Sequence, residues 1–262
     1  MSGHRYLDSA IEAALAAGRL QRSRFGSTVS VTMKGAKNLV TEVDLASEEL
    51  ITGMLLARYP GHGIQAEEGD YPEGDGQHTW IIDPLDGTTN YAHGYPWFCV
   101  SIALMAGGEL VAGVIHNPMT DELFTATAGT GAFRNGCRLS VSERQPLSDA
   151  LLATGFPYDC ASAPENNFAA FIRFQKAARG IRRAGAAALD LAYLAAGCLD
   201  GFWEVKLKPW DVAAGTLLVR EAGGLVTAFD GSYYDVANHR ILASNGLIHG
   251  EMIGLLAEES TP

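Results

Sequence analysis

Apolar side chains in the first segment of the chain recur at the spacing of an amphipathic helix, at Leu7, Ile11, Ala14, Leu15 and Gly18. Residues 26–43 then alternate between apolar and polar positions, which is typical of extended chain, with a polar loop at 34–38. A second helix is predicted to begin at Thr41 or Asp44, both favourable N-cap residues. It should end at Arg58, because a Tyr-Pro-Gly turn follows.

Short apolar stretches in the middle of the chain predict strands at Trp80–Ile82, Phe98–Met105 and Leu110–His116. Residues 121–141 are predicted to form a hairpin, since Asn135-Gly136 is a dipeptide that favours tight hairpin turns. The first part of the chain therefore reads as antiparallel strands that follow two helices.

Strands and helices alternate in the second part of the chain. The predicted strands are Ala150–Thr154, Gly201–Val205, Leu225–Phe229 and Ile241–Ser244. The predicted helices are residues 164–179, 186–197, 210–223 and 246–259. The polar, turn-forming residues 142–150 mark the expected boundary between an N-terminal α+β half, residues 1–145, and a C-terminal α/β half, residues 146–262.

Composition narrows the functional classes. The chain has 262 residues, of which 47% are hydrophobic and 19% are charged, so it can form a substantial core. The net charge of −11 argues against a nucleic-acid-binding surface, but it allows a phosphorylated substrate if metal ions supply positive charge. No apolar run is long enough to span a membrane, and Asp8 and Glu12 interrupt what could otherwise be a signal peptide.

Four cysteines are present, at positions 99, 137, 160 and 198, and none of them forms a C-x-x-C pair. We therefore expect reduced thiols in a cytoplasmic protein. The seven histidines show no H-x-x-x-H spacing, so no zinc site is expected.

Two carboxylates stand three residues apart at the end of an apolar strand. Asp83 and Asp86 are separated by a turn that contains Pro84 and is followed by Gly87. Such a turn can direct both carboxylates and the Leu85 carbonyl oxygen to one point, which suits Mg²⁺ because this ion prefers oxygen ligands. Taken alone, the same segment also fits a solvated turn that favours Asp.

Further acidic residues lie elsewhere in the sequence. Glu67 and Glu68 precede the pair by about 15 residues, and Asp211 stands at the start of a predicted helix. A solvated loop would explain the two glutamates, and helix capping would explain Asp211. Both acidic segments also belong to a resemblance to a known protein family that extends over residues 5 to 255.

The resemblance rests on six segments in a fixed order. They are Lys34–Asp44, Ala66–Gly69, Asp83–Asn90, Arg182–Asp190, Gly201–Glu204 and Trp210–Gly215. Together they resemble the inositol monophosphatase family. This resemblance implies a layered αβαβα fold of the inositol monophosphatase and fructose-1,6-bisphosphatase type, a homodimer, and inhibition by Li⁺.

The resemblance also implies Mg²⁺-dependent hydrolysis of a phosphate monoester with two or three ions. Glu67, Asp83 and the Leu85 carbonyl would hold one Mg²⁺, and Asp83, Asp86 and Asp211 would hold a second. A third, weaker ion would lie near Glu67, mostly through water. Paired ions of this kind can clamp a phosphate and activate a water for direct in-line attack.

By the same resemblance, Thr88 would orient the attacking water, with Asp44 as its acidic partner and Glu67 as a further catalytic residue. The residues alone leave helix capping open for both Thr88 and Asp44. The backbone N–H groups of Gly87 and Thr88 could also face the phosphate.

The substrate alcohol would be bound by a separate set of residues, which the resemblance gives as Asp86, Gly185, Ala186, Glu204 and Asp211. Family members often carry Ser or Thr at the position of Ala186, so this chain lacks one hydroxyl contact. A phosphorylated polyol, inositol monophosphate, is the expected substrate. Histidinol phosphate is the alternative, because a carboxylate could also bind its cationic groups, and other small phosphate esters share the scaffold.

A binding protein of the transcription machinery is a second class of function that the resemblance leaves open. The intact set of acids favours the enzyme, since a binding module does not need five carboxylates placed for metal ions. Membranes are not expected as partners, and the acidic net charge disfavours nucleic acid.

Overall fold

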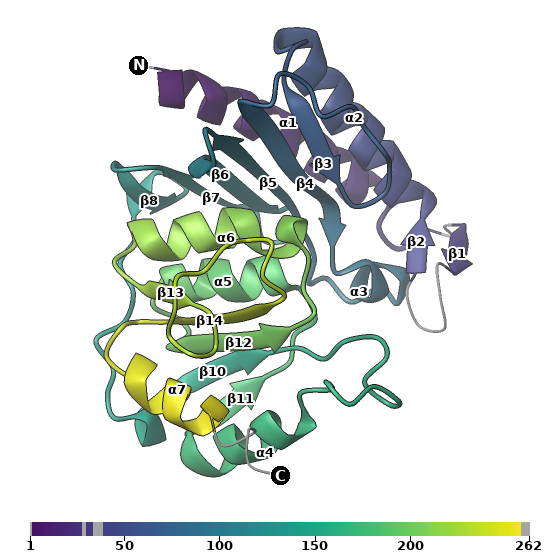
Figure 1. The fold of residues 1–262 in the computed structure, drawn as a ribbon. Coiled ribbons are helices and arrows are strands. Elements are labelled where there is room, and N and C mark those ends of the chain that lie inside the picture. The colour runs from purple at the N-terminus through teal and green to yellow at the C-terminus, as the bar shows by residue number, and fades with distance from the viewer. Residues whose placement is uncertain (1, 28–29, 34–38, 258–262) are drawn as a thin grey trace.

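The computed structural model describes residues 2–27, 30–33 and 39–257, which form five layers of helix and sheet (Figure 1). Two sheets alternate with three pairs of helices, α1 (Ser2–Arg24) with α2 (Glu42–Arg58), α5 (Ala187–Ala195) with α6 (Pro209–Glu221), and α4 (Phe168–Ala177) with α7 (His249–Ala257). The α5–α6 pair lies between the sheets. The predicted αβαβα layering is therefore confirmed.

The first sheet has seven strands in chain order. They are β3 (Gly63–Ala66), β4 (His78–Asp86), β5 (Cys99–Ala106), β6 (Glu109–Asn117), β7 (Glu122–Thr127), β8 (Gly131–Arg134) and β9 (Cys137–Arg138). The β3–β4 pair is parallel, and every later pair is antiparallel. Helices α1 and α2 cover the outer face of this sheet (Figure 1).

The second sheet has five strands in the order β11 (Gly180–Arg182), β10 (Leu151–Thr154), β12 (Gly201–Val205), β14 (Arg240–Ser244) and β13 (Leu225–Thr227). Strand β10 is parallel to both β11 and β12, whereas β14 is antiparallel to its neighbours. Smaller elements are the pair β1 (Val31–Met33) and β2 (Leu39–Thr41), the helix α3 (Thr88–Ala92) and a 3₁₀ turn at Leu147–Asp149.

The predicted elements are found with shifted ends. Helix α4 begins at residue 168 instead of 164, and α7 begins at 249 instead of 246. The predicted hairpin over 121–141 is three short strands, with Asn135 and Gly136 at positive φ between β8 and β9. The predicted loop 34–38, and Val29 before it, lie outside the described residues. Strands β3 and β11 and helix α3 were not predicted.

The central helix layer packs closely because its contact residues are small. A Cβ on Gly215 of α6 would lie 2.5 Å from the Cβ of Leu191 of α5, and a Cβ on Gly113 of β6 would lie 3.2 Å from the Ala214 carbonyl oxygen. Side chains from both halves of the chain share this core. The predicted division into two halves at residue 145 stays a prediction. Helix α6 of the second half packs on the sheet formed by the first half, so the two halves share one core.

The close contact at Gly215 predicts that Gly215→Ala lowers the free energy of unfolding by about 1–3 kcal/mol, because the added methyl overpacks the helix pair. Gly53→Ala is the matched control, since Gly53 lies inside α2 with open space around its Cα. That substitution should raise stability by about 0.5–1 kcal/mol. Urea unfolding of both variants checks this, and an unchanged or raised stability in Gly215→Ala would contradict the packing argument.

Candidate active site

An irregularity in β4 brings Asp83 and Asp86 to the same side of the sheet. Residues three apart in a regular strand point to opposite faces. Here Asp83 pairs with Ser101 and Asp86 pairs with Cys99, so β4 carries one extra residue at a β-bulge. The side chain of Gln21, buried in α1, supports the bulge by donating to the Pro84 carbonyl oxygen at 2.6 Å.

A glycine then turns the chain from the bulge into helix α3. Gly87 has φ of 98°, which only glycine adopts without strain. A Cβ there would also lie 3.0 Å from the Trp97 carbonyl oxygen. The turn makes Thr88 the first residue of α3, so the first N–H groups of this helix are free of intrahelical partners.

Thr88 and Asp44 are hydrogen-bonded in the core. The Thr88 hydroxyl donates to Asp44 Oδ1 at 2.7 Å and lies 3.1 Å from the Leu85 carbonyl oxygen. The other oxygen of Asp44 accepts from the N–H of Thr41 at 3.0 Å, within a capping box at the start of α2. Asp44 therefore caps its helix and also holds Thr88. Burial raises the pKa of Asp44, and the Thr41 and Thr88 hydrogen bonds oppose this.

Asp86 connects the bulge with the N-terminus of α5. Its Oδ2 accepts from the backbone N–H of Ala188 at 2.8 Å. The preceding residues Gly185, at φ of 85°, and Ala186, which is buried, lead into this helix. Asn90 of α3 fastens the same segment by donating to the Ala184 carbonyl oxygen at 2.9 Å. The predicted residues Gly185 and Ala186 thus lie beside Asp86.

Asp211 enters the site from α6. It stands in the first turn of this helix, and its Oδ2 accepts from the Lys208 N–H at 2.7 Å. The predicted capping role is therefore present together with a place in the acid cluster. Trp210 lines a surface cavity with Glu67, which follows directly after β3, and with Tyr71.

Glu204 lies on β12, with its side chain only slightly exposed. A Cβ at Gly155 would collide with its carboxylate, so the glycine after β10 leaves the space that Glu204 occupies. Burial raises the pKa of Glu204 well above its usual value, and the negative charges of Asp190, Asp211 and Asp86 add to the effect. The structure therefore brings Glu204 to the same cluster.

Like charges crowd together at this site. Burial, followed by repulsion from Glu67, Asp86 and Asp211, raises the pKa of Asp83 well above its usual value. Burial is also the main cause that raises the pKa values of Asp86 and Asp211 to about 7. Among the described residues, no ion pair involves Asp83, Asp86 or Asp211.

A hard cation fits this set of donors. The carboxylates and the Leu85 carbonyl offer only oxygen atoms, which Mg²⁺ prefers over nitrogen or sulfur. A bound cation would also relieve the repulsion that otherwise keeps protons on the buried acids.

Two residues near the cluster were not assigned a role from the sequence. Asp190 of α5 is buried, and burial followed by repulsion from Asp86 raises its pKa, while Arg183 opposes this. An acidic residue inside the apolar run Ala187–Ala195 was a usable signal. Desolvation and then the charges of Glu67 and Asp86 raise the pKa of Tyr158 to about 12, so this half-exposed residue lies within range of the charges of the cluster. No pattern in the sequence pointed to Tyr158.

Four helices, α2, α3, α5 and α6, begin at this acid cluster. Helix N-termini favour anions, and the carboxylates favour cations, so the site suits a metal ion and a phosphate together. That combination defines the class of metal-dependent phosphatases.

Comparisons with known proteins agree with this class. The sequence profile of the inositol monophosphatase family matches residues 4–261. An inositol-1-monophosphatase from Synechocystis is 45% identical over 254 residues, which cover 96% of this chain and 88% of that protein. A Nus factor SuhB from Pseudomonas aeruginosa is 48% identical over 246 residues, or 91% of each chain. The solved structure of an inositol monophosphatase from Anabaena (Nostoc) matches with a TM-score of 0.90 and 44% identity, covering 98% of this chain and 97% of that one.

The chain belongs to the inositol monophosphatase family, as the six sequence segments predicted. It is therefore a phosphatase that acts on a phosphorylated small molecule, in a family that is metal-dependent. Within its described residues, no helix has the length and apolar character needed to cross a membrane. The four cysteines are free thiols.

The raised pKa values predict how stability depends on pH without a divalent cation. Asp86 and Asp211 hold protons up to about pH 7 in the folded chain but lose them near the usual value of 3.8 when unfolded. The folded state binds more protons in this window, so the stability contribution of these groups falls as pH rises from about 4 to 7. Thermal unfolding in a chelator should show this slope.

Two variants test whether the buried acids cause this pH dependence of stability. Asp211→Asn should flatten the slope, whereas Asp8→Asn, an exposed substitution on α1, should leave it unchanged. Mg²⁺ at about pH 7.5 should raise the unfolding temperature of the unmodified chain. Equal slopes in the chain with and without Asp211 would contradict the assignment.

Proposed function

We propose that the chain hydrolyses inositol monophosphate to inositol and phosphate in a Mg²⁺-dependent reaction. The observation that carries the proposal is the convergence of Asp83, Asp86 and Asp211 with the Thr88–Asp44 hydrogen bond at the N-termini of α3 and α5. The names of relatives such as the Synechocystis inositol-1-monophosphatase support the choice of substrate.

Two groups of oxygen ligands would hold the ions. Glu67, Asp83 and the Leu85 carbonyl form the first group, and Asp83, Asp86 and Asp211 form the second. Glu67 would also serve a third, weaker ion through water. When bound, the ions supply positive charge for the phosphate and lower the pKa of a water.

Thr88 and Asp44 position the attacking water. The Thr88 hydroxyl directs its proton to Asp44 Oδ1 at 2.7 Å, which leaves Thr88 Oγ1 as an acceptor for a hydrogen of the water. Asp44 is fixed in this orientation by its capping box with Thr41. The free N–H groups at Gly87 and Thr88 orient the phosphate oxygens.

The alcohol part of the substrate would face Glu204, Asp211 and the Gly185–Ala186 segment. Glu204 is buried and accepts hydrogen bonds, which suits the hydroxyls of a polyol. Ala186 offers no side-chain hydroxyl, so this contact is missing. Histidinol phosphate remains the alternative substrate, since a carboxylate at position 204 also suits a cation. We further propose a homodimer.

Asp83→Asn should lower kcat/KM by about 100-fold or more, because Asp83 belongs to both ligand groups and loses its charge. The variant should fold, since Asn keeps the oxygen that accepts the Leu85 N–H at 3.0 Å. Asp8→Asn, an exposed substitution on α1, serves as the control and should keep full activity. Phosphate release from inositol 1-phosphate with Mg²⁺ measures the activity of both variants. Undiminished turnover in Asp83→Asn would contradict the assignment of Asp83 as a metal ligand.

Glu204 distinguishes a polyol from a cationic substrate. Glu204→Gln should keep most activity on inositol 1-phosphate, because the amide still bonds hydroxyls. Glu204→Leu should lower kcat/KM by about tenfold or more, since it leaves a buried substrate hydroxyl without a partner, at a cost of about 1–3 kcal/mol. Phosphate release from inositol 1-phosphate, histidinol phosphate and an aryl phosphate forms the panel. Preference for histidinol phosphate, abolished in Glu204→Gln, would replace the proposed substrate.

A second candidate function follows from the relatives named Nus factor SuhB, one of which is 48% identical. A role as a binding protein of the transcription machinery would not need the acid cluster. Asp83→Asn therefore separates the two functions, because it should lose phosphatase activity but still retain purified RNA polymerase in a pull-down. If neither the unmodified chain nor Asp83→Asn retains RNA polymerase, the binding-protein function is excluded.

A further inference from the structure

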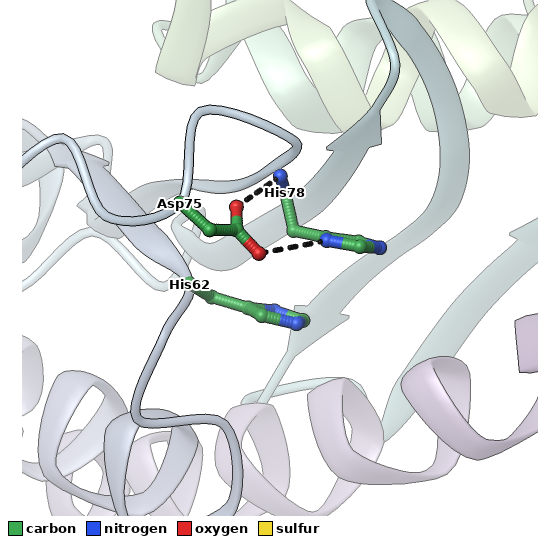
Figure 2. Close-up of side chains that lie close together, drawn as sticks. All are labelled: His62, Asp75 and His78. Carbon is green, nitrogen blue, oxygen red and sulfur yellow. Dashed lines mark hydrogen bonds and ion pairs between the residues drawn. The ribbon is translucent and has the colours of Figure 1, made fainter.

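Two histidines and an aspartate lie together at the end of the β3–β4 pair that is remote from the acid cluster (Figure 2). His62 directly precedes β3, and His78 is the first residue of β4. The two strands are parallel, with Gly63 opposite Thr79, so both histidines stand at the same edge. Asp75 lies on the loop that returns from β3 to β4. The active-site acids follow the other ends of these strands.

Asp75 is held in place as an anion. Its Oδ1 accepts from the N–H groups of Gln77 and His78, each at 2.8 Å. These backbone hydrogen bonds lower the pKa of Asp75 to about 2, so the carboxylate is charged at neutral pH. Its Oδ2 lies 3.2 Å from Nδ1 of His78 (Figure 2). One charged oxygen and one imidazole nitrogen are therefore already adjacent.

His62 supplies a nitrogen that lacks a partner. Its Nδ1 is buried and makes no hydrogen bond within the described part of the chain. Burial, followed by the charge of His78, lowers the pKa of His62, so the ring is neutral at pH 7 and keeps a free lone pair. A buried polar atom without a partner indicates a ligand or a water that completes the site.

We propose that His62, Asp75 and His78 form a binding site for Zn²⁺ or a similar divalent transition metal. A metal ion binds imidazole in its neutral form, so the two histidines and Asp75 would supply a ligand set with a net charge of −1, which zinc accepts. Asp75 is exposed, so water can fill a fourth position.

The ligands must move together when the ion binds. One ligand atom from each of the three residues lies within 4.8 Å of the others. Ligands around a tetrahedral zinc at about 2.0–2.1 Å stand about 3.3 Å apart, so no pair of ligands has to approach by more than about 1.5 Å, and Asp75 Oδ2 and His78 Nδ1 are already 3.2 Å apart. The two rings are stacked, with centroids 4.4 Å apart and planes within 6° (Figure 2). Since stacked rings direct their lone pairs along parallel lines, one ring turns out of the stack on binding.

The two sites would select different metals. The acid cluster offers only oxygen atoms and suits hard ions such as Mg²⁺, whereas imidazole nitrogen suits zinc and copper. Histidine spacing in the sequence showed no sign of this site. Asp75 and His78 belong to one turn, and the parallel pairing of β3 and β4 brings His62 to the same edge.

Equilibrium dialysis of the full chain against Zn²⁺, in saturating Mg²⁺, tests the proposal. One Zn²⁺ should bind per chain, and His62→Gln and His78→Gln should each weaken it by at least about tenfold. Asp75→Asn should do the same without disturbing the turn, since Asn keeps the oxygen that accepts the two N–H groups. His239→Gln is the control, because His239 is exposed and ion-paired elsewhere, with Glu165. Equal Zn²⁺ affinity in all four variants would overturn the site.

Cu²⁺ provides a second probe that distinguishes the two sites. Electron paramagnetic resonance should show coupling to imidazole nitrogen in the unmodified chain, and this coupling should be lost in the double variant His62→Gln, His78→Gln. A spectrum with oxygen ligands only would assign the ion to the acid cluster and overturn the proposal. Phosphatase activity in Mg²⁺ alone should be the same in all variants, so this test is independent of the proposed function.

Discussion

Repulsion among buried carboxylates is the constraint on which the arrangement of this protein depends. Asp83, Asp86 and Asp211 lose water and face one another, which raises the pKa of each. Such a cluster costs free energy when it is ionised and carries no compensating cation. The protein offsets part of this cost with backbone dipoles, because Asp86 and Asp211 each accept an N–H at the start of a helix. A bound metal ion would remove the rest of this electrostatic cost, and the free energy released would contribute to its affinity.

The same contacts connect the layers of the fold. Asp86 extends from the first sheet to the N-terminus of α5, and Asp44 of α2 holds Thr88 of α3. Each acid thus stabilises a helix terminus and also belongs to the site. The sequence alone could not separate a capping role from a place in the site, because in the structure the same side chain caps a helix and lies in the acid cluster.

The layered fold and most of the site were predicted from the family resemblance, whereas the residues alone indicated the elements and one pair of carboxylates. Pro84 and Gly87 in a carboxylate-rich turn indicated that Asp83 and Asp86 meet, and the bulge in β4 is how the backbone achieves it. Strand β3 was missed because its alternation, Ile64-Gln65-Ala66, extends over only three residues between loops, and its place in the sheet comes from pairing with β4. Tyr158 was missed because its place near the acids depends on a loop with no regular spacing. The His62, Asp75 and His78 cluster was missed for a similar reason, since strand pairing brings it together.

The shared core between the two sheets has a consequence for the order in which the chain becomes functional. A ribosome releases Asp44, Asp83 and Asp86 long before Asp211 and the Ala188 N–H that satisfies Asp86. A nascent chain that has emerged only to residue 145 therefore carries Asp86 without the N-terminus of α5, whose Ala188 N–H donates to it in the complete fold. Its first sheet also lacks the α5–α6 layer that covers its inner face. Competence to bind a metal ion thus arrives late in synthesis, with the last layers of the fold.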